Sequence, residues 1–335
     1  MKKSRTVSIG WLLGLFLLGV SYADGADNLK KVRLAYAGWE VGTAIAYIGI
    51  DAGIFKQYDL EVEEVFIRDP LSAGIQSLIG ADFLIGFGNP LAILQPMLSG
   101  ADIVSLGTHV SAVPSRMGVS ADISEIKDLK GKKIGVSGIG ERSDLLARVI
   151  LRRAGLDPVK DVEIVSAGLA PNRVAALSKN FIQGAPLTPE IADRAKQLGL
   201  KILEVKDVPL ITAMLMTTRS FIKKDEEAVR RFIKGYLAAT HFYLTRKKES
   251  IAIIRKYFGG TDPSALENMY NAFTAQLTPL PLPNREAAQA LIDAASVVNP
   301  KSSNLKPVDL FEPRFLEELR ASGFIDKLYA EKVSL

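Results

Sequence analysis

Residues 134–154 read IGVSGIGERSDLLARVILRRA, and this stretch indicates the fold class. Residues 134–137 form a short apolar run that predicts a β-strand, and residues 144–154 predict an α-helix. Between them lies a glycine-bearing loop, Ser137–Ser143. A strand, a loop and a helix in this order predict an α/β unit in a mixed, mostly parallel sheet.

The same alternation of short apolar runs and helical patterns continues on both sides of this stretch. Residues 32–107 predict one set of strands interleaved with helices, and residues 113–205 predict a second set. Two successive α/β units imply two lobes. Residues 210–217 form an apolar run without a turn residue, where the chain is expected to cross back to the first lobe.

Beyond residue 217 the chain is predicted to be helical. Apolar residues recur there at spacings of three and four, which is the pattern of one face of a long helix. Residues 278–283 alternate with proline and are therefore expected to be an extended connector. The predicted helix face consists of Val229, Phe232, Ile233, Tyr236, Leu237, Thr240 and Leu244.

The composition excludes several classes of protein. The 335 residues contain no cysteine, which excludes a thiolate nucleophile, a disulfide framework and a cysteine-ligated metal. Only His109 and His241 offer imidazole groups, so a metal site built from several histidines is not expected. No nucleophile elbow or paired-histidine zinc motif is present. We therefore expect no catalytic residues, no metal and no cofactor.

The N-terminus has the residue order of a secretory signal peptide. Three basic residues precede an apolar centre at residues 9–20, which is short for a membrane span. Small residues follow, and we expect cleavage after Ala23; the alternative is an uncleaved membrane anchor. Removal of residues 1–23 lowers the net charge from +5 to +2, so a nucleic-acid partner is not expected.

A second uncharged stretch, residues 83–100, is 18 residues long, which is close to the length of a membrane span. Pro90 and Pro96 interrupt it, and glycines at positions 86 and 88 break a continuous apolar helix. We interpret the stretch as a strand, a turn and a helix.

Candidate ligand-binding residues follow the predicted strands, because open parallel sheets bind ligands beyond the carboxyl ends of their strands. In the first unit these are Trp39, Glu40, Asn89 and Thr108. Trp39 offers an aromatic face and one N–H donor. Asn89 either contacts a ligand or caps the helix that follows it. His109 also stands at a strand end, either in the cleft or as a polar residue of its rim.

In the second unit the loop of residues 137–143 gives the strongest indication of a ligand-binding site. Glycines allow close backbone approach, and the N–H groups at the helix start favour a phosphate, sulfonate or carboxylate. The alternative is a turn with no ligand. A dinucleotide fingerprint is excluded because Ser143 stands in place of its third glycine. Arg142 and Arg173 are possible partners for an acid. The predicted second-unit contacts are Ser137, Gly138, Ile139, Ser143, Pro186 and Thr188.

Six ordered segments carry a family resemblance that extends over the predicted mature chain. They are KVRLAY (31–36), DAGIF (51–55), YDLEVE (58–63), SGADIV (99–104), DLKGKKIGV (128–136) and AGLDP (154–158). In this order they resemble the nitrate/sulfonate/taurine-type periplasmic solute-binding proteins of ABC transporters, which include relatives that bind thiamine-pyrimidine precursors.

The resemblance implies a type II periplasmic binding fold, a Venus flytrap of two lobes with one ligand in the cleft between them and a helical C-terminal part. We expect residues 24–112 and 218–335 to form the first lobe and residues 113–217 the second. The resemblance also places cleft loops at residues 38–40, 88–89, 137–143 and 186–188, and at Thr108.

The expected function is capture of a small organic ligand, such as a sulfonate, an aromatic or heterocyclic acid, or a pyrimidine-like compound. Glu40 and Glu141 disfavour a bare anion and favour a ligand that also offers an amine or ring N–H. A periplasmic monomer would deliver this ligand to an ABC permease and its ATPase. The alternatives are a ligand-binding partner of a membrane sensor and a pyrimidine-precursor enzyme on the same scaffold.

Overall fold

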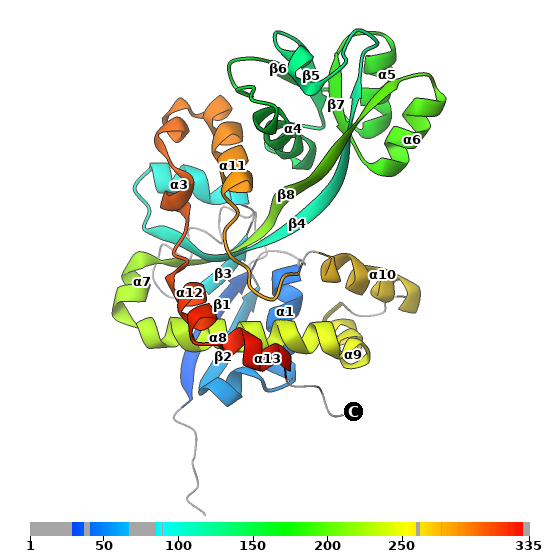
Figure 1. Cartoon of the computed structure of the whole chain (residues 1–335). Helices are drawn as coiled ribbons and strands as arrows, with labels where there is room; N and C mark the ends of the chain where they lie inside the picture. Colours follow the sequence, from blue (N-terminus) through cyan, green and yellow to red (C-terminus); the bar gives the residue numbers. More distant parts are fainter. Residues whose placement is uncertain are drawn as a thin grey trace, which may run out of the picture.

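The computed structural model describes residues 29–36, 41–66, 85–88, 90–258, 262–275 and 277–330. Over these residues the chain forms one mixed β-sheet with helices packed against it (Figure 1). The predicted signal peptide, residues 1–23, lies outside the described residues.

The sheet contains two groups of parallel strands. Its strands are β1 (Lys30–Tyr36), β2 (Leu60–Phe66), β3 (Ile85–Gly88), β4 (Ile103–Val119), β5 (Lys133–Val136), β6 (Glu163–Ser166), β7 (Gly184–Leu187) and β8 (Lys201–Thr218). Their order is β2-β1-β3-β8-β4-β7-β5-β6. β1 pairs in parallel with β2 and β3, and β5 pairs in parallel with β6 and β7. The predicted α/β class is confirmed, although the two expected sheets are joined into one.

Helices follow the strands in both halves of the chain, and the C-terminal third is helical as predicted. The α-helices are α1 (Val41–Asp51), α3 (Leu94–Leu98), α4 (Arg142–Arg153), α5 (Ala170–Ser178), α6 (Pro189–Gln197), α7 (Arg219–Lys224), α8 (Glu226–Thr245), α9 (Lys247–Phe258), α10 (Pro263–Thr274), α11 (Arg285–Val298), α12 (Arg314–Ala321) and α13 (Phe324–Ala330). The 3-10 helices are η1 (Phe55–Tyr58), η2 (Pro90–Ile93), η3 (Ile126–Leu129), η4 (Pro300–Asn304) and η5 (Pro307–Leu310).

β4 and β8 are longer than predicted. The sequence pattern predicted a strand at 103–107 and a separate extended segment at 113–120, but one strand of 17 residues spans Ile103–Val119. It stays continuous because β8, with 18 residues, pairs with it in antiparallel register from one end to the other. Pro114 falls in a register shift between Val113 and Ser115, where the missing N–H costs no ladder hydrogen bond.

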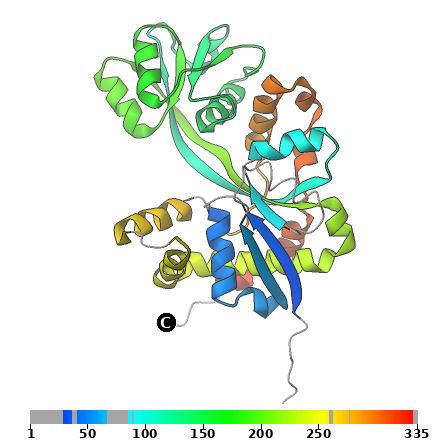
Figure 2. The ribbon, with the colours of Figure 1, turned by 180° about the vertical axis from the view of Figure 1, so that it is seen from behind.

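β4 and β8 connect two parts of the molecule (Figures 1 and 2). One part, here called the first lobe, contains β1, β2 and β3 with α1, α8 and α9 around them; the other, the second lobe, contains β5, β6 and β7 with α4, α5 and α6. The boundaries expected between residues 112 and 113 and between residues 217 and 218 stay a prediction.

Helix α8 forms the centre of the first-lobe core. Asp225 caps it by accepting a hydrogen bond from the N–H of Ala228. Six of the seven residues of the predicted helix face are buried, and Leu244 packs against the same core. Phe232 stacks on Phe55 of η1 with ring centroids 5.0 Å apart. Burial of each such side chain stabilises the fold by roughly 1.5–3 kcal/mol.

Residues 83–100 contain the strand β3, the turn η2 and the short helix α3, in the predicted order. Over the described part of the chain, no helix has both the length and the apolar character that crossing a membrane requires.

Candidate functional site

The loop Ser137–Ser143 joins the carboxyl end of β5 to the start of α4. The N–H of Ser137 donates to Oγ of Ser143 at 2.7 Å, and the two Oγ atoms lie 2.8 Å apart. The N–H of Glu141 donates to the carbonyl of Gly138. The predicted residues Ser137 and Ser143 are therefore brought together, at the edge of the sheet where the sequence placed them.

A buried ion pair supports this loop from within α4. The N–H of Gly140 donates to Oδ2 of Asp144 at 2.7 Å. Oδ1 of Asp144 lies 2.9 Å from Nε of Arg148, and both side chains are fully buried. The angles of this contact do not make a hydrogen bond, and the guanidinium nitrogens of Arg148 have no hydrogen-bond partner among the described residues. An ion pair thus lies beneath the loop, with the Asp144 carboxylate in contact with the loop backbone.

The N-terminus of α4 has no side-chain cap at its N-cap residue. Glu141 occupies the N-cap position with extended backbone, and its side chain makes no capping hydrogen bond. The first N–H groups of a helix have no partner within the helix, and the helix dipole favours negative charge at this end. These amides, together with the two serine hydroxyls, can hold a carboxylate or sulfonate group.

Arg173, in the first turn of α5, links the other loops at the same edge. Its Nη1 donates to the carbonyl of Gly168 at 2.8 Å and its Nη2 to the carbonyl of Pro186 at 3.5 Å. The side chain is 7% exposed, and within the described residues its Nε has no hydrogen-bond partner. Burial lowers the pKa of this guanidinium, and the nearby Glu141 carboxylate acts in the opposite direction.

Glu141 places a negative charge beside this positive one. A Cβ atom at Gly138 would lie 2.9 Å from Oε1 of Glu141, so the carboxylate folds back over the loop. Ile139, between the two glycines of the loop, is partly buried against the core. The second-lobe edge therefore offers hydrogen-bond donors and a cation for an acid, and an acceptor for an amine or ring N–H.

Pro186 and Thr188 belong to a strand and a helix start instead of an open loop. Pro186 lies inside β7, where every residue is buried, and its carbonyl accepts from Arg173. Thr188 is the exposed N-cap residue of α6. Pro186 therefore contacts the candidate site through its backbone carbonyl, which accepts from Arg173.

The loop also contacts η2, the 3-10 helix that follows β3. Gly140 has φ +81°, and a Cβ at this position would overlap Cδ1 of Leu91 in η2. The backbone conformation favours glycine here, and a Cβ would also displace the Leu91 side chain. The loop Ser137–Ser143 thus lies directly against η2, the segment that follows β3.

The hydrogen-bonding groups of Thr108 are bonded to a distant part of the chain, the connector before α11. It is buried, its N–H donates to the carbonyl of Pro281 at 2.9 Å, and its hydroxyl donates to the carbonyl of Leu282 at 3.2 Å. The structure therefore places Thr108 under the proline-rich connector.

The remaining first-lobe candidates, Trp39, Glu40 and Asn89, lie outside the described residues. His109 is buried, and its Nε2 lies 2.6 Å from the hydroxyl of Tyr236. Burial lowers the pKa of His109 to about 4, so its imidazole is neutral at pH 7.

Sequence reasoning did not identify Asp144 and Arg148 as part of the site. The available signal was two opposite charges four residues apart, with only apolar residues between them and at 149–151, which places them on one buried face. The described residues contain no group of three or more His, Cys, Asp or Glu side chains arranged to hold a metal ion.

Comparison with known families identifies the sequence class. The model of a family described as NMT1/THI5 like matches residues 41–250 of this chain. A search among curated proteins found no match.

Solved structures share the fold. The periplasmic sulfonate-binding protein SsuA from Methylobacillus flagellatus KT is 18% identical with a TM-score of 0.57, and the match covers 89% of this chain and 97% of that one. The periplasmic aliphatic sulphonate-binding protein SsuA from Escherichia coli is 18% identical with a TM-score of 0.52, and the match covers 85% of this chain and 96% of that one. A protein from Bordetella bronchiseptica RB50 is 18% identical with a TM-score of 0.54, and the match covers 87% of this chain and 97% of that one. These matches confirm a periplasmic-binding-protein fold.

Proposed function

The chain belongs to the NMT1/THI5-like family, and we propose that it is the solute-binding component of an ABC importer. In this proposal the protein captures a small organic acid and carries it to a membrane permease with its ATPase. The observation that supports this most directly is the uncapped N-terminus of α4 beside the buried guanidinium of Arg173.

The acid group of the ligand is proposed to bind at the second-lobe edge. Nε of Arg173 is buried without a hydrogen-bond partner among the described residues, and an unmet N–H of this kind costs roughly 1–3 kcal/mol unless a ligand satisfies it. The one hydroxyl proton that the Ser137–Ser143 hydrogen bond leaves over, and the amides at the start of α4, supply further donors. A sulfonate or carboxylate matches this set.

The rest of the ligand is proposed to be organic and to carry an N–H group. The Glu141 carboxylate over Gly138 repels a bare anion and accepts from an amine or a ring N–H. Trp39 and Asn89 are the proposed first-lobe contacts, with Trp39 packing on the organic body. Sulfonates and aromatic or heterocyclic acids fit this description, and the two SsuA proteins that share the fold bind sulfonates by their names.

We propose binding without catalysis. His109 is buried, hydrogen-bonded to Tyr236 and neutral, and so does not serve the site as an acid or base. The proposed location is the periplasm, reached after removal of residues 1–23, and the proposed form is a monomer.

A thermal-shift screen of residues 24–335 tests the proposal. The panel contains sulfonates, aromatic carboxylates, pyrimidines, amino acids and inorganic anions. An acid present at 100 times its dissociation constant adds about 2.7 kcal/mol to stability, which raises the melting temperature by several degrees. A shift with an organic acid that Trp39→Ala abolishes supports the proposal. No shift with any member of the panel, confirmed by flat calorimetric titrations, would overturn it.

A further inference from the structure

The segment around α11 leaves the first lobe and returns to it. Before α11, the carbonyls of Pro281 and Leu282 accept hydrogen bonds from Thr108 of β4. After η5, Phe311 forms a parallel bridge with Ser105 of the same strand, and the N–H of Glu312 donates to the carbonyl of Ser105 at 2.8 Å. Both ends of the excursion are therefore fixed to one short stretch of β4.

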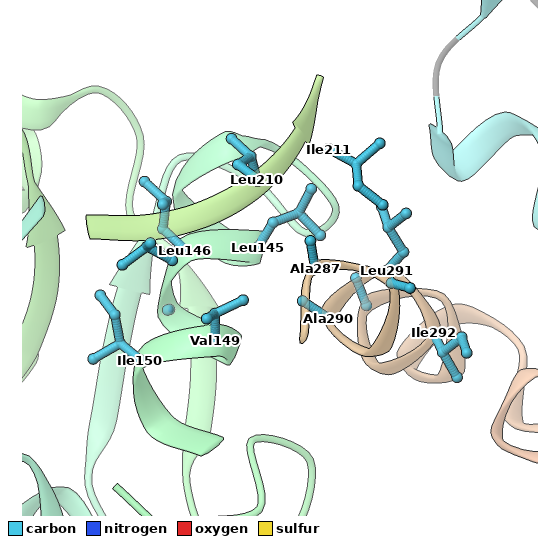
Figure 3. Packing of buried hydrophobic residues seen from close by; sticks show 14 of the residues in the cluster. Leu145, Leu146, Val149, Ile150, Leu210, Ile211, Ala287, Ala290, Leu291 and Ile292 are labelled. Atoms are coloured by element: carbon cyan, nitrogen blue, oxygen red, sulfur yellow. The ribbon is translucent and has the colours of Figure 1, made fainter. Parts of the chain in front are cut away.

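Between these two anchors, α11 packs against α4 of the second lobe. Figure 3 shows Ala287, Ala290 and Leu291 of α11 facing Leu145 and Val149 of α4, with β8 alongside. Small side chains at Ala287, Ala288, Ala290 and Ala294 are all buried and let the two helices approach closely. One apolar cluster thus contains residues of the second-lobe strands, of α4, of β8 and of α11.

Two ion pairs flank this apolar contact. Arg152 donates two hydrogen bonds to the carboxylate of Asp293, through Nε to Oδ2 and through Nη2 to Oδ1, the latter at 2.6 Å. Asp293 is 5% exposed and also accepts from Nε2 of Gln289 at 3.0 Å. Arg153 donates to Glu286 at 2.8 Å through Nη2. A bidentate pair with a buried carboxylate fixes both distance and orientation.

We propose that α11 is a strut that holds the second lobe at a fixed angle to the first, in addition to β4 and β8. A rotation about the register shifts in β4 that leaves α11 in its place on the first lobe moves α4 along or away from α11, and so breaks the bidentate pair of Arg152 and Asp293. The strut therefore narrows the range of lobe arrangements that the ligand-free protein adopts.

The strut also acts on the proposed ligand site, and this part rests on the proposed function. The N-terminus of α4 carries the loop Ser137–Ser143, and its last turn carries Arg152. When α11 packs against α4, as in this structure, Gly140 contacts Leu91 of η2. The second-lobe loop and the segment after Asn89 are therefore adjacent before any ligand binds. The strut thus preorganises the site, and its loss lowers the fraction of binding-competent protein.

The absence of cysteine allows a direct distance measurement. Ser178→Cys on α5 and Lys248→Cys on α9 place one spin label on each lobe, both at exposed positions. Double electron–electron resonance spectroscopy then gives the distribution of distances between the two spin labels in the ligand-free protein. The test variant is Asp293→Ala. The matched control is Glu267→Ala, which removes the carboxylate of an ion pair with Lys247 that lies within the first lobe.

The strut predicts one narrow distribution for the parent and for Glu267→Ala, and a broader one for Asp293→Ala. The swap Arg152→Asp with Asp293→Arg is expected to restore the narrow distribution, which separates loss of the strut from loss of folding. A distribution for Asp293→Ala as narrow as that of the parent overturns the proposal, as does equal broadening in Glu267→Ala.

Calorimetric titration with 2-aminoethanesulfonate separates this inference from the proposed function. Asp293→Ala is expected to bind this probe about tenfold more weakly than the parent, because fewer molecules have the competent arrangement. Equal affinity in both proteins overturns the link between strut and site. A broader distance distribution without binding of any panel member supports the strut and contradicts the proposed function.

Discussion

Asp144 and Arg148 of α4 form an ion pair 2.9 Å apart in which neither side chain is exposed to solvent. The second oxygen of Asp144 accepts from the N–H of Gly140, so the pair reaches the loop Ser137–Ser143. A buried cation is tolerated here because one carboxylate lies against it. The loop geometry therefore depends on a charge inside the helix.

Replacement of Asp144 by Asn is expected to destabilise the protein by about 3–5 kcal/mol, because it leaves the buried Arg148 charge without a counter-ion. Urea unfolding measures this change. The control is Asp193→Asn, which removes an exposed carboxylate 2.7 Å from Arg116 and is expected to cost at most about 1 kcal/mol. Equal costs for the two variants would contradict the account of the buried pair.

The contact between Gly140 and Leu91 is testable with a matched pair of glycines. Gly140 and Gly155 have φ +81° and φ +82°, but a Cβ at position 155 meets no atom within 4 Å. Both alanine variants lose about 1–2 kcal/mol to backbone strain. Gly140→Ala is expected to lose about 1 kcal/mol more, because Leu91 must leave its rotamer. Thermal unfolding of both variants checks this, and a smaller loss for Gly140→Ala than for Gly155→Ala argues against the contact.

Stability is expected to fall as the pH drops from about 6.5 to about 4, through the burial of His109. Its pKa is about 4 in the folded chain, below the ordinary value of 6.5, so the unfolded chain binds the proton first on acidification. Below pH 4, the shifted pKa of His109 lowers the free energy of unfolding by roughly 3 kcal/mol relative to its value at neutral pH. Unfolding free energies at several pH values measure it.

The variant His109→Gln is expected to show a smaller loss of stability over this pH range than the parent. His241→Gln is the control, since it leaves His109 in place. If the stability of the parent and of His109→Gln depends on pH in the same way, His109 is not the cause of the loss of stability.

The local elements of this fold were predictable, and its longest strands were not. The spacing from Val229 to Thr240 places the buried face of α8 on one side of a helix, which needs no knowledge of its neighbours. The length of β4 depends on β8, a segment about one hundred residues away that supplies its hydrogen-bond partners. The sequence pattern predicted a separate extended segment at 113–120, but a register shift opposite β8 keeps the strand continuous past Pro114.

The candidate site was predictable where one loop supplies it. Ser137 and Ser143 follow a strand and precede a helix, and the structure pairs them. Thr108 also follows the pattern of a strand end, but the connector at Pro281 and Leu282 covers it. A contact between β4 and a connector so distant in sequence is a property of the tertiary packing.

The measurement that tests the central claim most directly is the thermal-shift panel applied to Arg173→Gln. The exposed Arg194→Gln is the control with the same change of charge. An organic acid that stabilises the parent and Arg194→Gln by several degrees, and Arg173→Gln by much less, is the predicted result. Equal stabilisation of all three proteins by that acid would contradict binding at the α4 and Arg173 edge.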